Sequence, residues 1–301
     1  MEFLHILENI RFPLLDKIML AVTHLGSETA FLVVAILMFW CVDKRRGYYI
    51  LSVGFIGTMA NQFLKLWFRI PRPWVKDATL NPLEPALEDA SGYSFPSGHT
   101  QSSVGTFGGI GYTAKNKIIK ALCILIAILV PFSRMYVGVH TPLDVGVSVG
   151  IAVALIFLVK PFVYHKNGKL FPVLLLVMTA MAAGYMCFIK LYDFPADVDA
   201  ERLQSGINSG YTMIGCLVGL LLTYIVDEKW LHFPVKGAWW AQIIKVVIGL
   251  LLVLAIKSGL KTPLNALLGE YIGRSARYFL MVIMAGIIWP LSFKLFAKTK
   301  R

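Results

Sequence analysis

Long apolar runs separated by short polar connectors make up most of the chain. Each run has roughly the 20 residues that an α-helix needs to cross a bilayer. The runs lie at residues 18–42, 47–68, 97–114, 118–135, 142–160, 170–189, 207–226, 238–256 and 276–296. The third is the least apolar because it is rich in Gly, Ser and Thr, and small residues allow close helix packing. We therefore predict an all-α, polytopic transmembrane helix bundle of about nine spans, with the third helix buried at its centre.

The composition excludes a soluble domain. The chain has 301 residues, of which 57% are hydrophobic, and its mean hydropathy is +0.69. A formal net charge of +12 would favour nucleic-acid binding in a soluble protein. Here most Lys and Arg residues lie in the connectors, where membrane topology explains them better. We predict no nucleic-acid partner.

Cysteine usage points to neither a disulfide nor a metal site. Cys41, Cys123, Cys187 and Cys216 all lie within apolar runs. None belongs to a C-x-x-C pair, and none has His or Asp beside it in a ligand pattern. We predict no metal and no cofactor.

The first 17 residues mix apolar and charged side chains. They have neither a basic n-region nor a small-residue cleavage site, so they do not resemble a signal peptide. We expect an amphipathic helix at the membrane interface instead.

The charges of the connectors orient the chain. By the positive-inside rule, the face that carries most Lys and Arg is cytoplasmic. The basic segments on that face are 44–46, 115–120, 160–169, 229–236 and 294–301. The opposite face receives connectors 69–95, 134–141, 193–201 and 257–277. The last of these is an exception to the rule, because it carries Lys257, Lys261, Arg274 and Arg277.

Three stretches on the non-cytoplasmic face concentrate ionisable residues at the ends of apolar runs, where such residues usually mark a functional site. In the first, Lys65 and Arg72 are seven residues apart and project from one helix end, which Pro71 and Pro73 terminate near Ile70. Two cations in this position could bind an anion. The alternative, for this stretch taken alone, is that Lys65 and Arg72 only extend their charged ends to the membrane–water interface.

The second stretch, 94–99, leads directly into a helix. Ser97 is suited to be its N-cap, and the free N–H groups of the first turn at Gly98 and His99 form a ready anion site. The alternative is an ordinary capped helix with an isolated histidine.

The third stretch, 133–144, contains Arg134, His140 and Asp144. Asp144 follows His140 by four residues, so its carboxylate can bond one ring nitrogen and leave the other as a nucleophile or base. However, Thr141-Pro142-Leu143-Asp144 also has the form of a helix-capping sequence. Asp144 can serve the helix start, His140 or both.

Together these residues resemble the three-part signature of the type-2 phosphatidic acid phosphatase superfamily, which reads K-x6-R-P, P-S-G-H and S-R-x5-H-x3-D. Here it reads Lys65 with Arg72-Pro73, then 96–99, then Ser133-Arg134 with His140 and Asp144, without departure at any signature position. The resemblance covers roughly residues 47–160 and extends by fold to about 190. It implies a six-helix phosphatase core at 1–190, followed at 191–301 by an extension of three helices without an assigned role.

The resemblance implies a metal-independent phosphatase that works through a phosphohistidine. His140 would attack phosphorus, Asp144 would orient it, and His99 would protonate the leaving oxygen and then assist water. The phosphate oxygens would be bound by Lys65, Arg72, Arg134, Ser97 and Gly98. The residue chemistry agrees, because fixed cations and helix-end N–H groups stabilise the charge that develops in phosphoryl transfer.

The expected substrate is a membrane lipid phosphate or an isoprenoid pyrophosphate such as undecaprenyl pyrophosphate, hydrolysed at the non-cytoplasmic face of a bacterial plasma membrane. A phosphotransferase and a sugar-phosphate phosphatase of the same superfamily fit the signature equally. From a different class, an anion-binding transporter is the alternative. It is disfavoured because binding alone needs neither the His140–Asp144 pair nor His99. The signature leaves the headgroup and the oligomeric state open.

Connector 69–95 is long enough to cover such a site. We consider a substrate-gating lid there, with a solvated loop as the alternative.

Overall fold

The computed structural model describes all residues except 91, 166–167, 197 and 298–301. Among the described residues the only regular structure is helical, which confirms the predicted all-α class. The chain divides into two compact units. The first unit contains residues 1–32, 50–160 and 193–206, and the second contains 33–49, 161–192 and 207–301.

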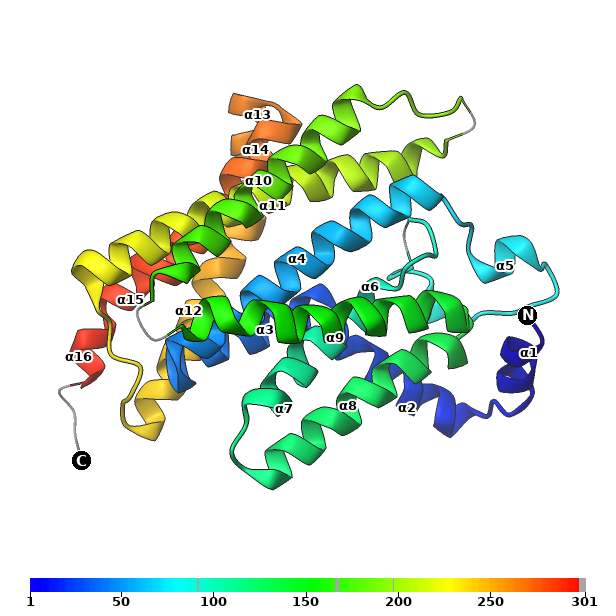
Figure 1. Cartoon of the computed structure of the whole chain (residues 1–301), viewed down its shortest axis with the longest axis horizontal. Helices are drawn as coiled ribbons and strands as arrows, with labels where there is room; N and C mark the ends of the chain where they lie inside the picture. Colours follow the sequence, from blue (N-terminus) through cyan, green and yellow to red (C-terminus); the bar gives the residue numbers. More distant parts are fainter. Residues whose placement is uncertain (91, 166–167, 197, 298–301) are drawn as a thin grey trace. The chain divides into compact units, whose positions relative to one another are not determined.

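The first unit gathers the N-terminal helices around α8. Its elements are α1 (Glu2–Asn9), α2 (Pro13–His24), the start of α3 (Glu28–Leu37), most of α4 (Lys44–Phe68), α5 (Pro73–Lys76), η2 (Glu84–Ala86), α6 (Gly98–Ser103), the π-helical η3 (Val104–Gly108), α7 (Gly109–Thr113), α8 (Lys117–Tyr136) and most of α9 (Pro142–Tyr164). α8 packs against α1, α2, α6 and α7 (Figure 1). This packing brings the ends of α4, α6, α8 and α9 into one unit.

The second unit is built mainly from the C-terminal half of the chain. Its elements are the π-helical η1 (Met38–Val42), α10 (Leu170–Leu191), α11 (Ala200–Val226) from Ile207 on, η4 (Asp227–Leu231), α12 (Trp239–Gly259), α13 (Lys261–Leu268), α14 (Glu270–Ile283), η5 (Met284–Ile288), α15 (Trp289–Leu291) and α16 (Phe293–Ala297). An aromatic cluster of Trp40, Trp289 and Phe233 around Phe293 packs its core.

A helix covers every apolar run that the sequence marks. Within the described part of the chain, six helical segments are long and apolar enough to cross a membrane, namely 117–136, 142–164, 170–191, 200–231, 239–259 and 270–295. A seventh is obtained if α2 and α3, which meet at 55°, count as one broken span. The helices at the second and third predicted spans do not reach that standard. α4 carries Asn61, Gln62 and Lys65, and the run from α6 to α7 is short.

The connector predicted at 257–277 is mostly helical. α13 occupies its middle, and α14 begins at Glu270 rather than near 276. The charged residues Arg274 and Arg277 interrupt the apolar run in the sequence, which is why the helix start was placed too late. Gly269, with a φ of +77°, makes the turn between the two helices, a backbone conformation that glycine adopts readily.

The N-terminal helices and α8 hold connector 69–95 at several points, while many of its side chains are exposed. His5 bonds Asp77 at 2.9 Å, and the Asn81 side chain donates to Glu8 at 2.9 Å. The Leu83 N–H donates to the Val137 carbonyl at 3.0 Å. Ala86 and Ala90 join a buried apolar cluster with Met19, Tyr136, Val137 and Val139. α1 and α2 are thereby anchored to the segment that joins α4 to α6.

Candidate active site

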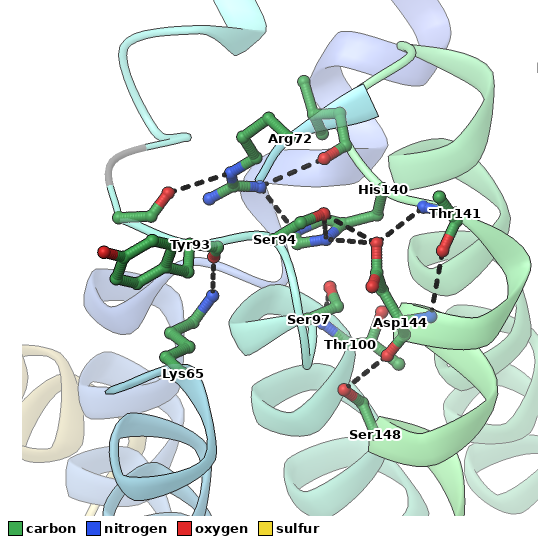
Figure 2. A network of polar contacts seen from close by, with 12 residues as sticks. Lys65, Arg72, Tyr93, Ser94, Ser97, Thr100, His140, Thr141, Asp144 and Ser148 are labelled. Atoms are coloured by element: carbon green, nitrogen blue, oxygen red, sulfur yellow. Dashed lines mark hydrogen bonds and ion pairs between the residues drawn. The ribbon is translucent and has the colours of Figure 1, made fainter. Parts of the chain in front are cut away.

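The three charged stretches meet within the first unit, where Figure 2 shows Lys65, Arg72, Ser97, His140 and Asp144 in one network of polar contacts. Lys65 stands in the last turn of α4, and Arg72 directly precedes α5. Ser97, Gly98 and His99 form the start of α6. Arg134 lies in the last turn of α8, His140 in the short loop that follows, and Asp144 in the first turn of α9. The signature residues therefore lie in the end turns of these helices or in the loop residues next to them.

His140 is held between a cation and a carboxylate. The side chain is 1% exposed, and its Nε2 lies 3.0 Å from Nη1 of Arg72 (Figure 2). Because a guanidinium can only donate, Nε2 must act as the acceptor in this contact. In the neutral ring the proton is then on Nδ1, which faces Oδ2 of Asp144 at 3.5 Å. Nε2 is left with its lone pair directed toward the arginine.

The surroundings of His140 keep its ring neutral. Burial lowers the pKa of His140 well below its usual value, and the positive charges of Arg72 and Arg134 lower it further. At neutral pH the unprotonated imidazole therefore predominates. This is the form that can act as a nucleophile or a base.

One oxygen of Asp144 serves the helix start and the histidine together. Oδ2 accepts a hydrogen bond from Oγ of Ser94 at 2.6 Å and from the Thr141 N–H at 2.8 Å, in addition to facing His140 (Figure 2). In return, Oγ1 of Thr141 accepts from the Asp144 N–H at 3.2 Å, which completes a capping box. The sequence left two roles open for Asp144, and the structure supports both.

Backbone carbonyls fix the position of Arg72, which is 2% exposed. Its Nε donates to the Gly92 carbonyl at 3.2 Å, and its Nη1 donates to the Val139 carbonyl at 3.0 Å. Burial, followed by the charge of Arg134, lowers the pKa of Arg72 to about 9. The guanidinium is still charged at neutral pH and faces His140 in a fixed orientation.

Lys65 and Arg134 add two buried cations. Nζ of Lys65 donates to the Tyr93 carbonyl (Figure 2). Arg134 is 0% exposed, and its Nη1 donates to Oγ1 of Thr23 at 2.8 Å. The Nε and Nη2 atoms of Arg134 are buried without a hydrogen-bond partner in the described part of the chain. Arg134 therefore has donors to offer to an anion.

The start of α6 has the predicted capping geometry. Oγ of Ser97 accepts from the Thr100 N–H at 3.4 Å, and the Ser97 N–H donates to the Asp144 carbonyl at 3.2 Å. The space that a side chain at Gly98 would enter is open to at least 4 Å. His99 keeps a buried Nε2 that has no partner among the described residues. This helix start is thus joined to the Asp144 turn and leaves room beside its first residue.

Two contacts of the site were not predicted. Ser94 bonds Asp144, and Thr23 of α2 bonds Arg134 across 111 positions of sequence. Serine and threonine are common near helix ends, so neither residue stands out in the sequence. The described residues include no group of three His, Cys, Asp or Glu side chains that could hold a metal ion.

Gly138 is expected to tolerate no side chain. Its φ is +83°, and an added Cβ would stand 3.1 Å from Cα of Pro82. Changing Gly138 to alanine should cost about 1–3 kcal/mol of backbone strain and displace the loop that carries His140. We expect a lower melting temperature and reduced turnover in a detergent assay. An unchanged melting temperature and an unchanged turnover for Gly138→Ala would contradict this account. Gly98 differs from Gly138 in this respect, because no atom lies within 4 Å of a Cβ added there.

Thr23 is expected to position Arg134 rather than to contact substrate. Removing its hydroxyl in Thr23→Val leaves Nη1 of Arg134 without its partner, which should raise KM about three- to tenfold with a smaller effect on kcat. Thr23→Ser should restore KM. Thr179→Val is the matched control, because the Thr179 hydroxyl donates to the Leu175 carbonyl of its own helix, at 2.8 Å, and to no other group among the described residues. A loss of stability in Thr23→Val without a change in KM would show a purely structural role.

Comparison with known proteins identifies the family. Residues 45–169 match the family model of the PAP2 superfamily, and residues 211–301 match that of the PAP2 superfamily phosphatase, transmembrane extension. Phosphatidylglycerophosphatase B of Bacillus subtilis (strain 168) is 30% identical over 166 residues, which are 51% of this chain and 77% of that protein. Undecaprenyl-diphosphatase BcrC of the same strain is 31% identical over 158 residues, 50% of this chain and 79% of that protein. No solved structure matches significantly.

The apolar helices and the converging cationic site thus define an integral membrane phosphatase. The chain belongs to the PAP2 superfamily, as the sequence signature indicated.

Proposed function

We propose that this protein removes phosphate from a membrane-embedded phosphate ester, through a covalent phosphate on Nε2 of His140. The observation that carries the proposal is the orientation of His140. Its Nδ1 faces Asp144, and its Nε2 lone pair faces Arg72, the direction from which an anion would approach. Burial and the lowered pKa of His140 favour the neutral, nucleophilic ring.

Substrate binding begins with the cations. A phosphate oxygen that accepts from Nη1 of Arg72 would replace Nε2 of His140 as its partner, which frees the nitrogen for attack. The unpartnered Nε and Nη2 of Arg134 supply further donors, and Lys65 adds positive charge. Ser97 and the backbone at Gly98 complete the set of phosphate contacts. Fixed donors of this kind lower the barrier because they need no rearrangement as charge develops.

The reaction then proceeds in two displacements. Nε2 of His140 forms a bond to phosphorus while the bond from phosphorus to the leaving oxygen breaks. His99, which is in its protonated imidazolium form when the anionic substrate is bound, donates a proton to that oxygen and becomes neutral. Asp144 stabilises the positive ring by bonding the Nδ1 proton. In the second step, water attacks phosphorus, His99 takes a proton from the water, and the bond to Nε2 breaks. Inorganic phosphate is released and both histidines return to their starting states.

The substrate class follows from the relatives and from the position of the site. The relatives are named for a phosphatidylglycerophosphate and for undecaprenyl diphosphate, both of which carry a charged phosphate on an apolar tail. A site at the ends of membrane helices lets the tail remain in hydrocarbon while the head reaches Arg72 and Arg134. A lipid phosphate or an isoprenoid pyrophosphate is therefore the proposed substrate.

We place the site at the non-cytoplasmic face of a bacterial plasma membrane, because the most basic connectors lie at the other ends of the helices. We assign the phosphatase core to residues 1–190, since every proposed contact with substrate falls between Lys65 and Asp144. Residues 191–301 form the extension, and the match to the extension model begins at residue 211.

The test is phosphate release by the purified protein in detergent and EDTA. The panel contains phosphatidate, phosphatidylglycerophosphate, undecaprenyl pyrophosphate and glucose 6-phosphate, each with and without added glycerol as an alternative acceptor. Release from a lipid substrate in EDTA supports the proposal. Activity confined to glucose 6-phosphate, product formation only with glycerol, or binding of all substrates without release would contradict it.

A further inference from the structure

A second group of cations with unpartnered N–H donors lies in the second unit, outside the site described above. The guanidinium of Arg277 also lies over the ring of Tyr278, 5.5 Å from its centroid. Arg277 stands in the middle of α14, within the candidate span 270–295, and is 5% exposed. Its Nε and Nη1 are buried and have no hydrogen-bond partner among the described residues. No described carboxylate forms an ion pair with it. An uncompensated charge in such a place is costly, so an anionic partner is expected.

Two more polar groups without partners lie beside Arg277. Arg274 precedes it by three residues and so shares its side of the helix, and the buried Nε of Arg274 has no partner in the described chain. Asn265 of α13 reaches α14 one turn earlier, where its Oδ1 stands 2.8 Å from the position of a Cβ on Gly273. That Oδ1 is also buried without a partner. These groups share the packing of α12, α13 and α14.

The surrounding segment is basic. Residues 257–277 carry four cations and one carboxylate, which gives a local charge of +3. Lys257 and Lys261 are exposed, as is the single acid, Glu270. The exposed lysines attract anions over a distance, whereas the buried Arg277 can hold one by direct hydrogen bonds. This is the segment that the positive-inside rule leaves unexplained, and a bound anion would account for its charge.

We propose that Arg277, Arg274 and Asn265 form a binding site for a phosphate group, separate from the phosphatase site. The Nε and Nη1 atoms of Arg277 each offer an N–H donor that a phosphate oxygen can accept, from a group that stays charged. Nε of Arg274 adds a third donor. The Asn265 amide can turn over and offer its NH₂ group. The phosphate is supplied either by the headgroup of a membrane lipid or by free inorganic phosphate, and the test separates the two sources.

The experiment measures the melting temperature of the full chain in detergent. It compares the wild type with Arg277→Met, which keeps an unbranched side chain and removes the charge. Replacing an unpaired buried charge by an apolar group is often stabilising, so this variant should fold and melt no lower than the wild type without ligand. Each protein is titrated with phosphatidylglycerol, with diacylglycerol as the lipid lacking phosphate, and with inorganic phosphate against chloride at equal ionic strength.

The proposal requires phosphatidylglycerol or inorganic phosphate to raise the melting temperature of the wild type. Arg277→Met should need at least about tenfold more of the same ligand for the same shift. Whichever of the two ligands acts identifies the source. The phosphatase site is unaltered in both proteins, so the difference between them reports Arg277 alone.

Three results would overturn the proposal. The first is an equal response of the wild type and Arg277→Met. The second is the absence of any response of the wild type to either phosphate ligand. The third is a loss of affinity in Lys257→Gln, the control at an exposed residue, as large as that in Arg277→Met. The last result would mean a diffuse attraction of anions to a basic surface. None of these results depends on which substrate the phosphatase site hydrolyses.

Discussion

Replacing His140 by alanine should abolish turnover and leave the fold intact. The ring supplies the atom that is proposed to bond to phosphorus, and no other described nitrogen occupies its place between Arg72 and Asp144. Loss of a nucleophile typically lowers kcat by at least about 10³-fold. The measurement is phosphate release in EDTA from the best lipid substrate, together with a melting curve of the same sample.

The control for this variant is His165→Ala, which removes an exposed histidine far along the chain from the site. That change should leave kcat and KM as they are. A labelled phosphoryl group that stays on the wild-type protein after acid-free quenching, and not on His140→Ala, would support the covalent step. Turnover by His140→Ala at more than about a tenth of the wild-type rate would exclude His140 as the nucleophile.

Asp144→Asn is the second variant with a large expected effect. The amide keeps an oxygen that can accept from Ser94 and Thr141, but it has no charge to stabilise the ring when Nε2 bonds to phosphorus. In a comparable His–Asp pair the same change lowers kcat by about 10⁴-fold. We expect a fall of about 10²–10⁴-fold in kcat, with a smaller change in KM.

Thr141→Val separates the two roles of Asp144. It removes the hydroxyl that accepts the Asp144 N–H but leaves the carboxylate in place. Its expected cost is about 1 kcal/mol of stability, as for other lost helix caps, with little change in kcat. If Thr141→Val lowered kcat as much as Asp144→Asn, helix capping rather than charge would explain the effect of Asp144.

The signature residues of the site could be predicted because, within each stretch, they lie only a few positions apart in the sequence. His140 and Asp144 are one helical turn apart, and Ser97 precedes the helix that it caps, so local geometry is enough to connect them. The partners Ser94 and Thr23 could not be found in this way. They meet Asp144 and Arg134 across 50 and 111 positions, so only the tertiary fold brings them together, in the case of Thr23 through the packing of α2 on α8.

The helices could be predicted because they too are encoded locally, as runs of apolar residues. The apolar run 118–135 in α8 has polar residues only near its ends, at Lys120 and at Ser133-Arg134, so it reveals both the existence and the limits of the helix. α14 was misplaced at its start because Arg274 and Arg277 break the apolar pattern while the backbone remains helical. Charged residues that a helix buries are therefore the main source of error in reading boundaries from hydropathy.

The anchoring of α1 and α2 bears on how much of the chain makes up a working catalyst. The matched phosphatase region begins at residue 45, yet Thr23 bonds Arg134, and a Cβ at Gly26 would stand 2.8 Å from the carbonyl oxygen of His99. Arg11 donates to the Tyr136 carbonyl at 2.7 Å, just before the loop that carries His140. Residues upstream of the matched region thus contact Arg134, His99 and Tyr136 and so support the loop that carries His140. A fragment cut at the family boundary would keep every signature residue and lose the support that aligns them.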